Sequence, residues 1–268
     1  MTGLRQKSAA WKTLVFVLVG LLLLGWLLNT PAGLLGKADA IGYAVCHRID
    51  LRSFHLGDRQ LPLCARCTGM HLGALLGLAY QAILSRRKAG LPPRRVQVVL
   101  GLLACAFAVD GANSFLSLIP GAPSLYEPQN LLRLLTGTGM GLAIAVLLFP
   151  AFNQTAWRDW QSQPALTGFK QLGGLVALAL LLDLVVLSGN PLVLYPLALL
   201  SAAGVLVELT LVYAMVAMMV FRAENLYTRL AQMLLPLTGG FGLGLLQIAA
   251  LDFIRYLFTR TWDGFHLG

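Results

Sequence analysis

Long apolar stretches separated by short polar segments set the pattern of this chain. Seven of these stretches are long enough for a helix to cross a bilayer, which takes roughly 17–25 apolar residues. The predicted spans cover residues 13–29, 68–85, 96–119, 130–150, 171–188, 192–221 and 229–258. We therefore predict an all-α fold, a polytopic transmembrane helical bundle of about seven spans that forms a single membrane domain over residues 1–268.

The composition favours a membrane protein over a soluble one. The 268 residues are 57% hydrophobic and 12% charged, whereas soluble domains carry about 25% charged residues. The expected partner is therefore the lipid bilayer. The net charge of +9 does not indicate nucleic-acid binding, because the basic residues lie in short segments between apolar stretches. The sequence identifies no protein partner.

The distribution of Lys and Arg predicts the orientation in the cell membrane. With the N-terminus in the cytoplasm, the inner segments hold 12 basic residues and the outer segments hold 7, while Arg133 stands at a helix start. This excess follows the positive-inside rule. Residues 30–67 are then extracytoplasmic, in a compartment where disulfides can form.

Residues 30–67 concentrate the reactive side chains of the chain. Three of the four cysteines lie there, and three thiolates with one imidazole form a common structural zinc set. We therefore predict a site for zinc or another transition metal, with Arg52, Arg66, His55 and His71 in supporting positions. The predicted ligands are Cys46, His47, Cys64 and Cys67.

The helix that follows these cysteines has two different faces. If it begins near Cys64, then Cys67 and His71 fall within about 60° of that cysteine around the helix axis. The other side carries a stripe of small residues at a spacing of four, which lets a neighbouring helix approach closely. The stripe consists of Gly69, Gly73 and Gly77.

Two other interpretations of the thiols remain open. A Cys-x-x-Cys at a helix N-terminus beside Arg66 has the features that lower a thiol pKa and favour disulfide exchange. Under this interpretation the protein is a thiol-disulfide oxidoreductase that uses Cys64 and Cys67, with Cys46 as shuttle and a quinone as lipid-soluble cofactor. The third interpretation is a plain structural disulfide. Whether the protein is an enzyme is left open.

Charged residues inside the predicted spans form a second group of candidates. Charges at membrane depth are costly and tend to pair or to line a cavity. One hypothesis pairs Arg133 with Asp110 and so pins two helices together. The other places the acids in a polar pocket below residues 30–67 or along the path of a transported ion or small solute. The acids are Asp110, Asp183, Glu208 and Asp252.

The Cys/His-containing run resembles the signature of a family of uncharacterised bacterial and archaeal membrane proteins, known as a domain of unknown function. The resemblance rests on residues 46–48, 52–54 and 61–69, and extends weakly through residues 110–111 and 130–137. It covers about the first 150 residues and implies no activity. It does imply that position 71 is usually aromatic, which favours His47 over His71 as a ligand. The signature residues are Cys46, His47, Arg52, Ser53, Phe54, Cys64, Arg66, Cys67 and Gly69.

Overall fold

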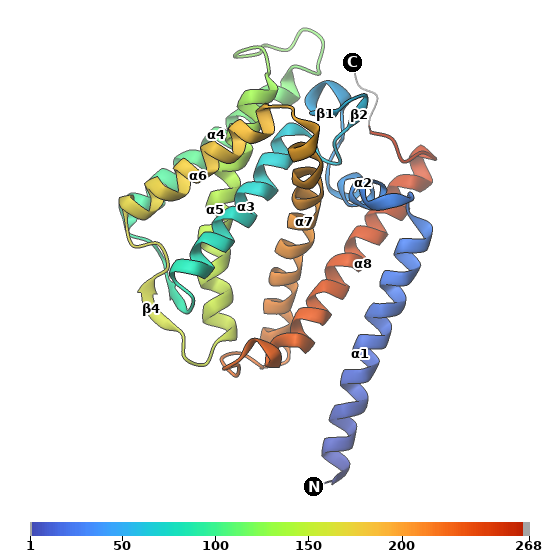
Figure 1. Ribbon diagram of the computed structural model, residues 1–268, viewed down its shortest axis with the longest axis vertical. Helices are drawn as coiled ribbons and strands as arrows, with labels where there is room; N and C mark the ends of the chain where they lie inside the picture. The colour runs from blue at the N-terminus through green and yellow to red at the C-terminus, as the bar shows by residue number, and fades with distance from the viewer. Residues whose placement is uncertain (1, 265–268) are drawn as a thin grey trace.

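The computed structural model describes residues 2–264, with side chains described from residue 10, and forms a helical bundle (Figure 1). Seven helices among the described residues are long and apolar enough to cross a membrane, so the predicted transmembrane bundle is confirmed. The α-helices are α1 (Thr2–Asn29), α2 (Gly33–Val45), α3 (Ala65–Leu84), α4 (Arg94–Leu116), α5 (Asn130–Ala156), α6 (Phe169–Leu187), α7 (Pro191–Val220) and α8 (Leu234–Thr259).

The short elements lie between the helices. Two 3₁₀ turns, η1 (Asp50–Arg52) and η2 (Leu230–Met233), precede a hairpin and α8 respectively. Strands β1 (His55–Leu56) and β2 (Arg59–Gln60) pair antiparallel, with His55 opposite Gln60. Strands β3 (Lys88–Gly90) and β4 (Gln161–Pro164) pair in parallel.

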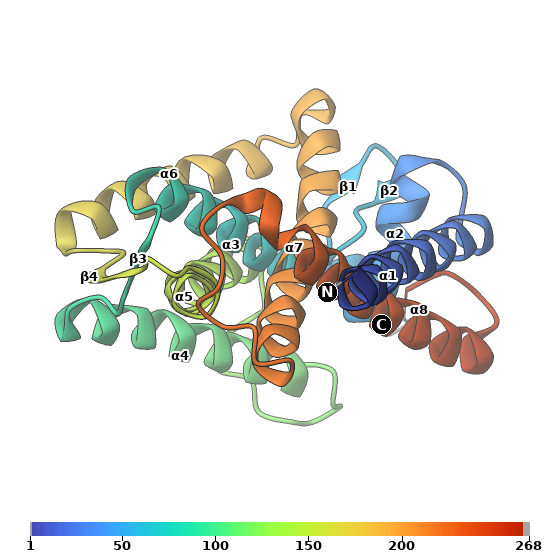
Figure 2. The ribbon, with the colours of Figure 1, turned by 90° about the horizontal axis from the view of Figure 1, so that it is seen from below.

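Helices α3 and α5 form the centre of the bundle, with α4 and α6 on opposite sides of them (Figure 2). The glycine stripe predicted on α3 faces α5. A Cβ added at Gly73 would lie 2.6 Å from the Thr138 carbonyl oxygen, and one at Gly69 would lie 2.4 Å from the Leu134 carbonyl oxygen. Only hydrogen at these positions allows so close an approach of two backbones, so the predicted packing role of the stripe is confirmed.

Residues 30–67, predicted as a loop, contain regular secondary structure. They contain α2, η1 and the β1–β2 hairpin, and they lie at the end of the bundle opposite the start of α1 (Figure 1). Helix α3 begins at Ala65, three residues before the predicted start, so Cys64 becomes its N-cap and Cys67 lies in its first turn. Helix α1 stands at the edge of the bundle and packs against α8 (Figure 2).

Candidate metal centre

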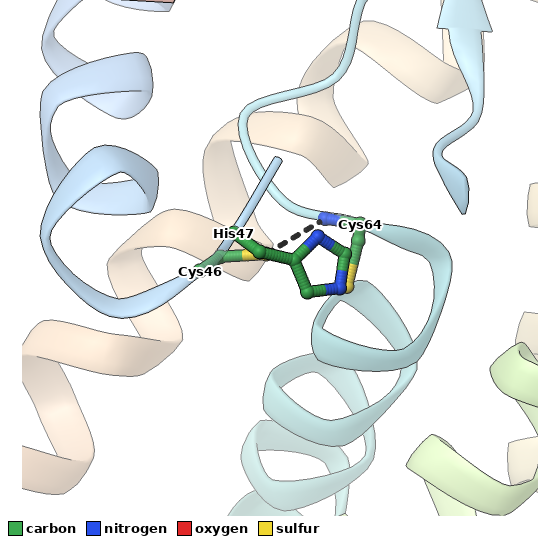
Figure 3. Close-up of side chains that lie close together, drawn as sticks. All are labelled: Cys46, His47 and Cys64. Carbon is green, nitrogen blue, oxygen red and sulfur yellow. Dashed lines mark hydrogen bonds between the residues drawn. The ribbon is translucent and has the colours of Figure 1, made fainter. Parts of the chain in front are cut away.

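Three of the four predicted ligands converge at the junction of α2 and α3. The Sγ atoms of Cys46 and Cys64 and a ring nitrogen of His47 all lie within 4.8 Å of one another (Figure 3). Both cysteines are buried, with 6% and 2% of their surface exposed, and His47 is partly buried. Ligands of a tetrahedral zinc ion stand about 3.3–3.8 Å apart. Small rotamer changes would therefore bring these three atoms onto one ion.

A close backbone approach brings the two cysteines together. A Cβ on Gly42 would lie 1.8 Å from the Pro62 carbonyl oxygen, so α2 can rest on residues 61–64 only because position 42 is glycine. Helix α2 then ends, with the Cys46 N–H donating to the Gly42 carbonyl at 2.8 Å. The backbone N–H of Cys64 donates to Cys46 Sγ at 3.3 Å. This sulfur therefore faces the N-terminus of α3.

The turn after Cys46 orients the imidazole. Arg48 adopts a left-handed conformation with φ 51° and is held by Asp39 at 2.9 Å. Beyond it, the Ile49 N–H donates to His47 Nδ1 at 3.0 Å. A neutral ring that accepts at Nδ1 carries its proton on Nε2, and the ring lies beside the Cys64 sulfur (Figure 3).

Cys67 supplies a third thiol next to these two. Hydrogen bonds from Cys46 and then Cys67 to the Cys64 sulfur lower the pKa of Cys64, and a bond from His47 acts in the same direction. The hydrogen bond to Cys64, together with burial, raises the pKa of Cys46 to about 12, although Cys67 opposes this shift. The shared hydrogen bond therefore makes Cys64 the more acidic thiol of this pair. All four cysteines are free thiols, and Cys105 is exposed on α4.

The two histidines predicted in supporting positions, His55 and His71, have partners elsewhere. His55 Nε2 lies 2.8 Å from Asp50 Oδ1 on the exposed hairpin. His71 Nδ1 lies 3.0 Å from Glu208 Oε1, so this imidazole joins α3 to α7. Neither histidine belongs to the group formed by Cys46, His47 and Cys64.

The predicted Arg133–Asp110 pair is wrong, because Asp110 binds Arg66. The guanidinium of Arg66 donates through Nη2 and, at 3.0 Å, through Nε to the same Asp110 oxygen. Arg133 instead donates to Asn130 Oδ1 at 2.9 Å. Arg66 in the first turn of α3 reaches Asp110 directly, and counting residues along the α4–α5 hairpin could not reveal this neighbour from a different helix.

The Arg66–Asp110 pair is the centre of a buried polar cluster beside the thiols. Tyr126 in the α4–α5 link donates to Asp110 Oδ1 at 2.8 Å. Arg52 Nη2 donates to the Ser114 carbonyl oxygen at 2.7 Å. The sequence interpretation included the two arginines but missed Tyr126 and Ser114, which look like ordinary turn and helix residues.

The other three acids within the spans contact residues outside this cluster. Asp183 Oδ1 accepts from Thr138 Oγ1 at 2.7 Å, and Asp252 Oδ2 accepts from Trp26 Nε1 at 3.1 Å. Among the described residues, Glu208 lines one cavity and Asp252 lines a different one. Glu208 and Asp252 therefore line separate cavities, and Asp183 and Asp252 have hydrogen-bond partners outside the Arg66–Asp110 cluster.

Comparison with known proteins places these residues in a family. Residues 46–147 match the family described as "Predicted membrane protein (DUF2085)". An uncharacterized protein of Methanothermobacter thermautotrophicus is 31% identical over 103 residues, which are 38% of this chain and 83% of that protein. The chain belongs to the DUF2085 family.

A second archaeal relative agrees with this assignment. An uncharacterized protein of Methanocaldococcus jannaschii is 25% identical over 122 residues, which are 46% of this chain and 72% of that protein. No solved structure matches the chain. The DUF2085 match begins at Cys46 and ends within α5, so it includes every predicted metal ligand and leaves α6, α7 and α8 outside.

Proposed function

We propose that this DUF2085 protein binds a transition metal, zinc above all, through Cys46, Cys64, Cys67 and His47. The observation that carries the proposal is the convergence of two buried sulfurs and one imidazole nitrogen within 4.8 Å. Cys67, outside that group, offers a further thiol from the first turn of α3. Buried thiolates need a cation, and three sulfurs with one nitrogen suit zinc.

The proposed role of the metal is structural. Four protein ligands leave no open position for a substrate, which is the usual arrangement of structural zinc sites. Cys46 ends α2, whereas Cys64 and Cys67 begin α3. The ion would therefore fasten α2 and the hairpin to the end of the membrane bundle.

Metal analysis of the purified protein tests this proposal. Wild-type protein should hold about one zinc ion per chain, and Cys46→Ser, Cys64→Ser and Cys67→Ser should each lose most of it, because each removes one ligand. Cys105→Ser is the matched control, since that thiol is exposed on α4 and should leave the zinc content unchanged. Equal zinc in the wild type and in the triple-cysteine variant would eliminate the proposal.

The proposed location of the site is the extracytoplasmic face. Exposed basic residues lie in or beside the segments that connect α3 to α4, α5 to α6 and α7 to α8: Arg86, Arg94, Arg95, Arg158, Lys170, Arg222 and Arg229. In a bundle of seven spans, these three connections are on the same side of the membrane as the start of α1. In residues 30–67 and the first turn of α3, Arg48 is paired with Asp39, and Arg66 is paired with Asp110. The free positive charge thus favours a cytoplasmic position for the start of α1.

A thiol-disulfide oxidoreductase is the second candidate, and the state of His47 favours it. Because Nδ1 accepts from the Ile49 N–H, ligation of a metal by Nε2 would move the ring proton to Nδ1 and break that hydrogen bond. The present tautomer instead places an N–H beside the Cys64 sulfur, an arrangement that stabilises a reactive thiolate. Oxidation of Cys64 and Cys67 to a disulfide would release two electrons and two protons, which a quinone takes up to become a quinol.

Titration of the thiols separates the two candidates. A metal site should keep its cysteines reduced and protected from alkylation until a chelator is added. A redox site should contain no stoichiometric metal and should cycle between free thiols and a disulfide when oxidised and reduced quinone analogues are added in turn. His47→Ala should weaken the metal site more than His71→Ala does, because only His47 lies beside the thiols.

A further inference from the structure

A separate cavity of about 730 Å³ lies between α1 and α8, away from the residues that match the family. Four aromatic side chains and one carboxylate give it an unusual lining for a membrane protein. The residues that matter here are Trp26, Asp252, Phe253, Tyr256 and Trp262, with Gly25 on the α1 wall.

Asp252 has one carboxylate oxygen without a hydrogen-bond partner. The residue is 4% exposed, and Oδ2 accepts from Trp26 Nε1 at 3.1 Å. No atom of the described residues donates to Oδ1, although this atom is buried. Buried carboxylate oxygens without a donor are rare in proteins, so the hydrogen bonds of the described residues compensate this carboxylate only in part.

The lining restricts the chemistry of a ligand in this cavity. A carboxylate repels anions, and a molecule that only accepts hydrogen bonds offers it no donor. A protonated amine brings both N–H donors and a positive charge, and the faces of Trp and Tyr rings attract cations. The apolar remainder of the wall, which includes Leu21, Leu22 and Ala249, suits a hydrocarbon body.

The position of the cavity suits a ligand that arrives through the bilayer. Trp26 stands three residues before the end of α1, so the carboxylate that it binds lies within about one helical turn of that end. Helix α1 stands at the edge of the bundle (Figure 2), and its span is 6% buried. A molecule dissolved in the membrane could therefore reach the α1–α8 boundary from the side.

We propose that this cavity binds a lipid-soluble amine, with its ammonium group at the Asp252 carboxylate and its apolar body against the aromatic wall. The ammonium group could belong to a free amphipathic amine or to a phospholipid headgroup such as phosphatidylethanolamine. The site is independent of the metal proposal, because none of the predicted metal ligands lines the cavity.

Native mass spectrometry of the full chain in a non-ionic detergent tests this site with dodecylamine as probe and dodecanol as the uncharged control. One molecule of dodecylamine should bind saturably, and dodecanol should not. Asp252→Asn should bind dodecylamine about tenfold or more weakly, because the charge-assisted hydrogen bond is lost. The control is Asp183→Asn, which removes another buried carboxylate outside the cavity and should bind normally.

A second variant tests the cavity without touching the carboxylate. Nothing lies within 4 Å of a Cβ added at Gly25, so Gly25→Leu should fold normally, fill the cavity and lower dodecylamine binding by a similar factor. Wild-type affinity in either Asp252→Asn or Gly25→Leu, or equal binding of dodecanol, would overturn the proposal.

The lipid content of the sample separates the two sources of the ammonium group. If the ammonium group belongs to a lipid headgroup, phosphatidylethanolamine should copurify with the wild type but not with Asp252→Asn, and it should compete with dodecylamine. A free amine predicts equal dodecylamine affinity with and without that lipid. Both results support the site and identify its ligand.

Discussion

The Arg66–Asp110 pair permits a quantitative test of how this end of the bundle is held together. Asp110 is 1% exposed and Arg66 is 14% exposed, and they share two hydrogen bonds to one carboxylate oxygen. Asp110 also accepts from Tyr126. The substitutions Asp110→Asn and Arg66→Gln keep the approximate side-chain size and each remove one charge.

The expected loss follows from the burial of the pair. Removal of one partner of a buried ion pair costs about 3–5 kcal/mol, because the other charge is left without compensation. Arg66 binds this carboxylate, and the guanidinium groups of Arg52 and Arg133 both donate to Ser114, one helical turn further along α4. Burial and then the charge of Arg66 lower the pKa of Arg52, so these positive charges are close enough to repel. We therefore expect Asp110→Asn to lie toward the upper end of the range.

Arg133 provides the matched comparison. Its guanidinium donates to Asn130 and, at 3.4 Å, to Ser114, both of which are neutral. Arg133→Gln should therefore cost about 1.5–3 kcal/mol per lost hydrogen bond, because the donor is charged, and reduced repulsion should offset part of this loss. In an Asp110→Asn background, its removal should be nearly neutral or slightly stabilising.

Thermal unfolding in detergent, followed by circular dichroism, measures these effects. A loss of 3–5 kcal/mol corresponds to a fall in Tm of roughly 6–20 °C for a chain of this size. The Asp110→Asn/Arg66→Gln double variant should lose less than the two single losses added together. This description of the cluster would be refuted if the stability losses of Asp110→Asn and Arg66→Gln simply added in the double variant. It would also be refuted if Asp110 were coupled more strongly to Arg133 than to Arg66.

Three further predictions follow from the helix packing, the orientation and the thiols. Gly73→Ala should destabilise the protein by about 1–3 kcal/mol because its methyl group would enter the backbone of α5, whereas Gly101→Ala, with nothing within 4 Å, should not lower Tm. In intact cells, an impermeant maleimide should label Asp58→Cys on the hairpin but not Glu224→Cys at the opposite end, and the reverse pattern would invert the proposed orientation. Zinc affinity, measured by competition with a chelator, should fall as the pH falls. The reason is that Cys46, whose pKa is raised to about 12, must lose its proton to bind the ion. A zinc affinity that does not depend on pH would exclude thiolate ligation.

The helical bundle was predictable because its signal is periodic and long. Seven apolar stretches required seven spans, and the spacing of Gly69, Gly73 and Gly77 indicated which face of α3 meets another helix. The segment 30–67 was less predictable. Helix α2 contains four glycines or alanines among its buried residues, so its apolar face is weakly marked in the sequence.

The thiol cluster was predicted by residue type, but its geometry depends on contacts that the sequence does not mark. Cys46 meets Cys64 because Gly42 lets α2 rest on the Pro62 carbonyl, and His47 is oriented by a backbone N–H from Ile49. Gly42, Pro62 and Ile49 make these contacts through their backbone atoms, and none of them has an ionisable or nucleophilic side chain. Spacing along the chain predicted the ligand types, whereas the positions of the ligands follow from backbone packing.

The error over Arg133 shows the same limit for charges. Depth along adjacent helices favoured an Arg133–Asp110 pair, yet pairing in a bundle is decided by which side chains share a face across all neighbouring helices. Arg66 lies between Cys64 and Cys67 in the sequence, directly before Cys67, and its side chain binds Asp110 on α4. The first turn of α3 therefore joins the thiol cluster on one side to the arginine cluster on the other. A metal bound by Cys64 and Cys67 would fix this turn and, through Arg66, the position of α4, so loss of the metal should loosen the Asp110 cluster as well as the segment that precedes α3.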